Sequence, residues 1–169
     1  SGGLGNQMFQ FATGYTVAKR NNVKLSLDLK RFTLRQDHNG FELQKVFDIY
    51  SNVKLLDNRS FFGLINFKEI IDKIDFTYTK FNEPHYHYTK KILNISKHSK
   101  LNGYWQSELY FKDYSEEIKK IFSFSKQLNK NNSLITNEIK HYNSISIHIR
   151  RGDYLLPNNT KFNTDLKNY

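Results

Sequence analysis

Apolar residues near the start of the chain recur at helical spacing. Six apolar or small side chains fall on one face of residues 6–20: Met8, Phe9, Phe11, Ala12, Tyr15 and Ala18. The polar pair at 21–22 then ends the pattern, which predicts an amphipathic helix over residues 6–20. Between 23 and 30 apolar and polar residues alternate, which is the period of a half-buried strand. A glycine-rich turn, a helix and a strand in about 30 residues predict most of a βαβ unit, whose first strand would precede Ser1.

The spacing of apolar and polar residues is less regular in the middle of the chain. Residues 31–40 are polar and loop-like, and residues 41–51 hold a short apolar patch of helical or irregular form. Residues 67–74 predict a short helix, and the aromatic run at 76–81 alternates as a strand does. From Leu101 the sequence predicts a strand that leads into an aromatic turn.

The last third of the chain carries further element signals. Asp113 and Glu116 have the spacing of a capping box and predict the start of a helix that runs through Phe122. The remaining predicted elements are a linker at 126–132, a short helix at 134–141, a β-branched strand at 144–149 and a loop at 150–154. That loop would lie at the carboxyl end of its strand, where open α/β sheets bind ligands.

The length and composition indicate the broad class of protein. A chain of 169 residues with 38% hydrophobic and 25% charged residues has the length of one domain, or of one domain plus part of another. It contains no cysteine, which excludes disulfides and Cys-ligated metal centres. No apolar stretch approaches the roughly 18 residues that a membrane-spanning helix needs.

The net charge of +10 raises the possibility of an anionic partner. A basic nucleic-acid-binding module is the alternative function that this charge leaves open. The lysines are scattered singly among asparagines and isoleucines, whereas a nucleic-acid groove needs clustered charge, so we expect no nucleic-acid partner. A mildly basic surface also suits anionic small molecules, or peripheral contact with anionic lipids on the cytoplasmic face of a membrane.

The chain opens with a glycine-rich turn that leads into the first predicted helix. Backbone N–H groups of Gly3, Gly5 and Asn6, together with the positive helix end, can hold an anion or a sugar hydroxyl. The turn is not a dinucleotide fingerprint, because Met8 stands where the third glycine would be, and it is not a P-loop. A tight connection between a strand and a helix is the structural alternative.

The segment from His148 to Tyr154 is the second candidate site. Arg150 and Arg151 are neighbours in a chain with only six arginines, and the arginine fork matches phosphate oxygens two at a time. In a strand, His148 and Arg150 share a face, so Arg150 is the better candidate for a ligand contact and Arg151 for a carboxylate partner. Asp153 can orient a guanidinium or hold the loop. A surface hairpin joined by salt bridges is the structural alternative.

Three missing patterns narrow the chemistry. No Asp-x-Asp pair is present to hold a divalent metal, so we expect no metal. His85 and His87 have no ligand-spaced partner and are predicted to be surface residues. No G-x-S-x-G sequence is present, so a hydrolase elbow has no support.

Four segments, in order along nearly the whole chain, resemble the alpha-1,2-fucosyltransferase family. They are Gly2-Gly3-Leu4-Gly5-Asn6-Gln7-Met8-Phe9-Gln10, Phe41-Glu42-Leu43, Gly103-Tyr104-Trp105-Gln106-Ser107-Glu108 with Tyr110-Phe111, and Ser146 through Tyr154. The resemblance implies an inverting glycosyltransferase that moves L-fucose from GDP-fucose to the 2-hydroxyl of a terminal galactose in a glycan. It also implies an α/β, Rossmann-like fold, the N-terminal portion of a two-domain GT-B enzyme.

The resemblance also assigns roles to residues. Arg150 would bind the diphosphate of GDP-fucose and stabilise the departing GDP without a metal, with His148 near the nucleotide and Asp153 bracing the loop. Arg150 and Asp153 are therefore the candidate catalytic residues, and Arg151 completes the donor-binding element. Gly3, Gly5 and Asn6 would line the cleft near the transferred sugar. The base that deprotonates the acceptor is unassigned between Asp153 and Glu108.

On this interpretation the chain covers one domain and the start of another. Residues 1–141 would form the N-terminal Rossmann-like domain without its first strand, and residues 142–169 the start of the GDP-fucose-binding domain. We expect these residues alone to be inactive, because the guanine pocket and part of the acceptor site would lie elsewhere. The expected location is the bacterial cytoplasm, with peripheral contact at the inner face of the membrane.

Overall fold

The computed structural model describes residues 2–30, 32, 39–56, 78–124 and 129–147. The chain divides into two compact units between Lys126 and Gln127, whereas the predicted domain boundary at residue 141 stays a prediction. The first unit mixes helices with parallel strands, in agreement with an α/β protein. Within the described residues no helix is both long and apolar enough to cross a membrane. The predicted helix at 67–74 lies outside the described residues.

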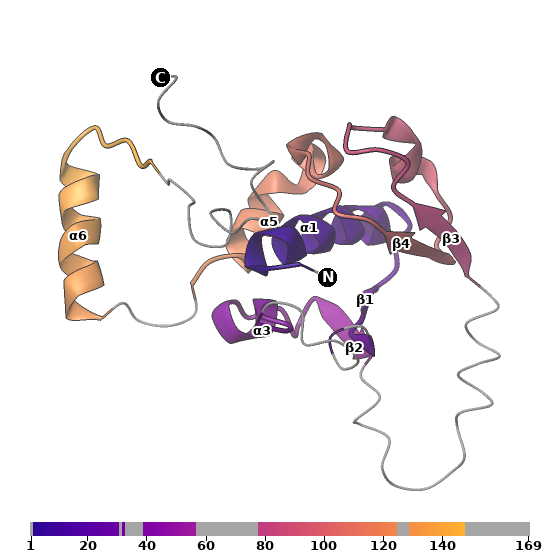
Figure 1. The fold of residues 1–169 in the computed structure, drawn as a ribbon, viewed down its shortest axis with the longest axis horizontal. Helices are drawn as coiled ribbons and strands as arrows, with labels where there is room; N and C mark the ends of the chain where they lie inside the picture. The colour runs from indigo at the N-terminus through magenta and orange to yellow at the C-terminus, as the bar shows by residue number, and fades with distance from the viewer. Residues whose placement is uncertain (1, 31, 33–38, 57–77, 125–128, 148–169) are drawn as a thin grey trace, which may run out of the picture. The chain divides into compact units, whose positions relative to one another are not determined.

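Helix α1 (Leu4–Arg20) is the central element of the first unit (Figure 1). It begins two residues before its predicted start and ends where the periodicity ends, so this prediction is confirmed. Every residue from Phe11 to Ala18 is buried, because the helix has neighbours on several faces. It packs against strand β1 (Leu25–Asp28), against α3 (Leu43–Val46), and against two short 3₁₀ helices, η2 (Lys90–Asn94) and η3 (Glu108–Tyr110).

Strand β1 pairs in parallel with β2 (Val53–Leu56), with Leu25 opposite Val53. Burial alternates along β1, which confirms the predicted half-buried strand. The sequence pattern does not predict β2, because four residues carry too little periodicity. The connection between the two strands contains α3, within the predicted apolar patch at 41–51. Three residues of that patch are buried: Leu43, Phe47 and Ile49.

A second parallel pair is formed by β3 (Thr79–Asn82) and β4 (Ser99–Asn102). Strand β3 confirms the strand predicted at 76–81 over residues 79–81, while residues 76 and 77 lie outside the described residues. Strand β4 confirms the strand predicted at Leu101, and it begins at Ser99. The Lys100 ammonium lies 2.6 Å from the Asp28 carboxylate, so an ion pair joins β4 to the carboxyl end of β1. Burial favours a higher pKa for Asp28, but hydrogen bonds from Lys100 and from the backbone of Lys30 lower that pKa overall.

Two apolar clusters contact α1. The first contains Phe11, Ala12 and Tyr15 of the helix, packed with residues of α3, β2 and α5 (Ser115–Ile121). The second combines aliphatic and aromatic side chains and contains five buried residues: Val17, Ile92, Leu93, Trp105 and Tyr110. The rings of Trp105 and Tyr110 meet edge to face with centroids 5.8 Å apart, a favoured aromatic geometry. This second cluster supports the turn that follows β4.

The capping box predicted for the helix after Asp113 is wrong. Helix α5 begins at Ser115 with Tyr114 in the N-cap position, and no side chain caps it. Asp113 lies inside the 3₁₀ helix η4 (Lys112–Tyr114) and cannot adopt the extended backbone of an N-cap residue. Its carboxylate instead lies 3.5 Å from the guanidinium of Arg20 at the end of α1.

The second unit contains helix α6 (Lys130–His141). The predicted linker at 126–132 is wrong from Lys130 onward, because the Asn129 side chain accepts a hydrogen bond from the backbone N–H of Asn132 and caps the helix there. Residues 126–128 of that linker lie outside the described residues.

The predicted strand at 144–149 is not formed over residues 144–147. Ile145 and Ile147 are 91% and 81% exposed. A strand needs a hydrogen-bonded neighbour, and no strand in the described part of the chain pairs with these residues. The alternating pattern therefore has no partner to bury it here. The rest of the segment, residues 148 and 149, lies outside the described residues.

One buried side chain ties the start of α1 to the segment before α3. Gln7 is 2% exposed. Its Nε2 donates to the carbonyl oxygens of Gly2, at 2.9 Å, and Gly40, at 2.8 Å, and its Oε1 accepts from the backbone N–H of Glu42 at 2.8 Å. A buried amide that satisfies three backbone groups fixes the positions of all of them.

We predict that Gln7→Met lowers the free energy of unfolding by about 2–3 kcal/mol, because the variant keeps the volume but leaves two carbonyl groups and one N–H without partners. Chemical denaturation measures the change. The matched control is Gln44→Met, since Gln44 is exposed and accepts only from the Tyr50 hydroxyl. A loss no larger than that of Gln44→Met, which we expect within about 0.5 kcal/mol, would contradict the role of Gln7.

Candidate functional site

Three of the four segments singled out in the sequence meet at one edge of the first unit. Strand β4 ends at Asn102 and leads into the turn 103–107, which contacts the N-terminal turn of α1. The segment 40–42 joins the same turn through Gln7. Parallel strands of α/β proteins bind ligands beyond their carboxyl ends, and the turn 103–107 lies at that end of β4. We call this group of residues the carboxyl-edge site.

The N-terminal turn of α1 leaves its helix end open. Gly2 has a φ of 90°, and a Cβ there would meet the side chain of Asn6, so glycine is required. Gly3 is the N-cap residue, no side chain caps the helix, and its first turn carries no acidic residue. A Cβ at Gly3 or Gly5 would have nothing within 4 Å. The positive helix end therefore has room for an anionic or hydroxylated ligand.

A direct side-chain contact joins this turn to the segment after β4. Gln106 Nε2 donates to Asn6 Oδ1 at 2.5 Å, across a separation of 100 residues in the chain. The contact is exposed and leaves each side chain further hydrogen-bonding capacity. The Nδ2 of Asn6 can donate and the Oε1 of Gln106 can accept. Such a pair of amides offers a sugar hydroxyl both kinds of partner.

The turn 103–107 is held in shape by Glu83. Its carboxylate accepts hydrogen bonds from the backbone N–H groups of Tyr104, at 2.7 Å, and Trp105, at 3.0 Å. Gly103 packs so closely on Glu83 that a Cβ would collide with it. Trp105 has a φ of 56° and is 1% exposed, so burial of its ring holds an otherwise unfavourable backbone conformation.

The residues that follow this turn are anchored by a buried tyrosine. The Tyr110 hydroxyl accepts from the backbone N–H of Thr89 at 3.0 Å and donates to the carbonyl of His87 at 3.3 Å. Burial raises the pKa of Tyr110, with a smaller contribution from the charge of Glu83. The hydroxyl therefore stays protonated and can make both bonds. Ser107 accepts from the N–H of Leu109 and caps η3.

The sequence-predicted site residues are only partly brought together. Gly3, Gly5 and Asn6 lie at the carboxyl-edge site as expected. His148, Arg150, Arg151 and Asp153 lie outside the described residues, so their roles stay predictions. Glu108 is an exposed residue in the first turn of η3.

Sequence reasoning missed three residues that shape the carboxyl-edge site. Gln7 and Gln106 lie inside the segments that carry the family resemblance, so their presence there was a usable signal. Glu83 had no signal, because its partners lie 21 and 22 residues away along the chain. Its role follows only from the tertiary fold.

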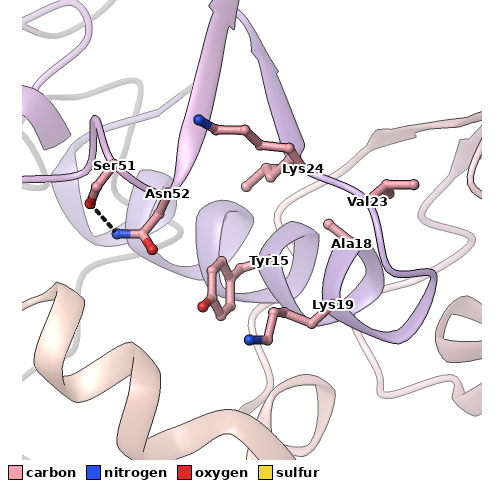
Figure 2. A pocket seen from close by; sticks show the side chains of 8 residues that line it. Tyr15, Ala18, Lys19, Val23, Lys24, Ser51 and Asn52 are labelled. Carbon is pink, nitrogen blue, oxygen red and sulfur yellow. Dashed lines mark hydrogen bonds between the residues drawn. The ribbon is translucent and has the colours of Figure 1, made fainter.

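A separate hollow of about 260 Å³ lies at the amino ends of β1 and β2 (Figure 2). Two of its polar side chains share one partner: the Lys19 ammonium lies 3.0 Å from the Glu117 carboxylate, which also accepts from the Tyr15 hydroxyl at 2.8 Å. Hydrogen bonding by Lys19 lowers the pKa of Glu117, and burial raises that of Tyr15. Asn52 donates to Ser51 at 3.0 Å. Apart from the exposed Lys24, the polar side chains of this hollow pair with one another or with Glu117, so the hollow is less suited to bind a ligand than the open helix end.

The exposed histidines do not form a metal cluster. The rings of His85 and His87 lie 5.5 Å apart, and the His85 Nδ1 accepts from the backbone N–H of His87. Across the described ranges, no three His, Asp or Glu residues gather as metal ligands would. Both histidines are exposed, which confirms their prediction as surface residues.

Comparison with known proteins identifies the family. The model of glycosyl transferase family 11 matches residues 1–166. An alpha-1,2-colitosyltransferase of Escherichia coli is 34% identical over 160 residues, which are 92% of this chain and 53% of that protein. The chain thus spans about half the length of this curated relative. No solved structure matches significantly. The resemblance read from the sequence is confirmed: the chain belongs to glycosyl transferase family 11.

Proposed function

We propose that this chain forms the N-terminal part of an inverting enzyme that transfers L-fucose from GDP-fucose to the 2-hydroxyl of a terminal galactose in a glycan. The observation that carries the proposal is the meeting of three family segments at the carboxyl-edge site, through Gln7 and the Asn6–Gln106 pair. Membership in family 11 supports a nucleotide-sugar donor and a glycan acceptor.

The proposed roles of the residues follow from the charge that develops during the reaction. As the sugar leaves, negative charge develops on the diphosphate, and a neutralising group there lowers the barrier. We assign that task to Arg150 in place of a divalent metal, with Asp153 bracing its loop, His148 near the nucleotide and Arg151 paired to a carboxylate. Gly3, Gly5 and Asn6 would face the transferred sugar. The acceptor base stays open between Asp153 and Glu108.

The proposal includes the wider architecture. The chain would supply one Rossmann-like domain and the start of a second, facing each other across a cleft in a GT-B enzyme. It would then be inactive without the rest of the donor domain. The expected setting is the bacterial cytoplasm, with peripheral contact at the inner face of the membrane, where the net charge of +10 would favour anionic lipid.

A colitosyl donor is the second candidate, because the Escherichia coli relative is named for colitose transfer. It would use the same site and form the same alpha-1,2 linkage. Assays of the complete enzyme with GDP-fucose and GDP-colitose, at equal concentration and with one galactoside acceptor, separate the two candidates. A higher kcat/KM for GDP-fucose supports the main proposal, and a higher value for GDP-colitose overturns its donor.

We predict that Arg150→Ala in the complete enzyme lowers kcat on the order of 100-fold, because the diphosphate loses its neutralising partner. The thermal unfolding temperature should not change. The control is Lys80→Ala, which removes an exposed positive charge from β3. Transfer by Arg150→Ala within about threefold of the wild type would remove the phosphate role from this arginine.

We predict opposite effects of Gly5→Ala on stability and on activity. Alanine favours the helix and meets no neighbour here, so the free energy of unfolding should rise by about 0.5 kcal/mol. The added methyl group would project into the space proposed for the donor and should lower transfer.

Gly103→Ala is the contrasting variant, because its methyl group would collide with Glu83 and should reduce stability. Denaturation and initial-rate assays measure both effects. A Gly5→Ala enzyme that is more stable and fully active would show that the donor does not approach this turn.

A further inference from the structure

A rigid loop next to the carboxyl-edge site presents an exposed aromatic side chain. Tyr86 is 75% exposed, and its ring lies 6.5 Å from that of Tyr104, centroid to centroid, with 33° between their planes. Tyr104 belongs to the turn 103–107, two residues before Gln106, which contacts Asn6. Tyr104 therefore extends the carboxyl-edge site along this turn, and Tyr86 lies against it. We call them the tyrosine pair.

The loop that carries Tyr86, from Glu83 to Thr89, is held in place at both of its ends. Glu83 accepts from the N–H groups of the turn 103–107. Beyond Tyr86, the buried Tyr110 hydroxyl binds the backbone at His87 and Thr89. The ring of Tyr88 packs on Tyr110 with centroids 5.0 Å apart. Little conformational entropy is then lost when a ligand contacts the loop, which is the condition for a pre-organised binding surface.

The chemistry of the surface suits a carbohydrate. Stacking on an aromatic face needs C–H groups from the ligand, while the amides of Asn6 and Gln106 at the same site can bind its hydroxyl groups. A galactose ring has one face formed by the C3, C4 and C5 hydrogens, and its hydroxyl groups point to the rim.

We infer that the tyrosine pair is the stacking platform for the acceptor sugar, and that it takes the apolar face of a β-galactoside. This inference rests on the proposed function, and it adds the place where the acceptor ring lies. The platform would hold the galactose next to the Asn6–Gln106 pair. Tyr86 is then a specificity-determining residue, since it touches the acceptor and makes no contact with the donor.

The test measures binding of methyl β-D-galactopyranoside to the complete protein by saturation-transfer NMR, with no donor present. The wild type should saturate H3, H4 and H5 of the sugar most strongly. Tyr86→Ala should weaken binding about tenfold, equivalent to ~1.4 kcal/mol, and Tyr86→Phe should stay within about twofold because it keeps the ring. Tyr50→Ala is the matched control, since Tyr50 is also exposed, at 59%, but lies before β2.

Kinetics give a second readout. Tyr86→Ala should raise the KM for the galactoside about tenfold and leave the KM for GDP-fucose unchanged. Each variant should unfold at the wild-type temperature, because the exposed ring contributes little to the core.

Three results would overturn the platform. They are galactoside binding by Tyr86→Ala within about twofold of the wild type, equal weakening by Tyr50→Ala, and no galactoside binding by the wild type. Failure of the proposed function alone would give a different result. The wild type would bind the galactoside and Tyr86→Ala would weaken that binding, but no fucose would be transferred from GDP-fucose.

Discussion

The hydrogen bonding of one buried amide organises the candidate site. Gln7 is enclosed in the first turn of α1, where its side chain has three backbone partners, two of them more than 30 residues away along the chain. An unpaired amide at this depth would be costly, so the segment 40–42 and the helix start must move together. The hydrogen bonds of Gln7 therefore also fix the position of the open helix end. A second amide contact, between Asn6 and Gln106, extends the same constraint to the turn after β4.

The site combines rigid supports with unsatisfied binding capacity. Its backbone is held by buried or anchored groups, namely Gln7, Glu83, Trp105 and Tyr110. The groups that face outward are a helix end without a side-chain cap, two amides with spare hydrogen-bonding atoms, and exposed rings. This division is typical of binding sites, where a fixed scaffold presents polar groups that water satisfies until a ligand replaces it. The hollow at the amino ends of β1 and β2 has the opposite character, since its Lys19 and Tyr15 side chains already bind Glu117.

Local patterns in the sequence predicted part of this arrangement. Helix α1 and strand β1 followed from periodicity, because each buries a regular face. The capping box failed because the backbone at Asp113 is part of a 3₁₀ turn, which sequence spacing does not reveal. Residues 144–147 pair with no strand in the described part of the chain, and they show that an alternating pattern needs a neighbour before it becomes a strand. The role of Glu83 could not be predicted, since it depends on contacts across more than 20 residues. The arginines at 150 and 151 stay a sequence prediction.

The proposed function requires the donor to bind at the carboxyl-edge site. Amide chemical shifts of the complete, isotope-labelled protein, recorded as GDP-fucose is added, show where the donor binds. We predict shift changes at Gly3, Gly5, Asn6 and Gln106 and across residues 149–154, with none at the hollow that includes Asn52. Changes confined to that hollow, with the first turn of α1 unaffected, would contradict this requirement.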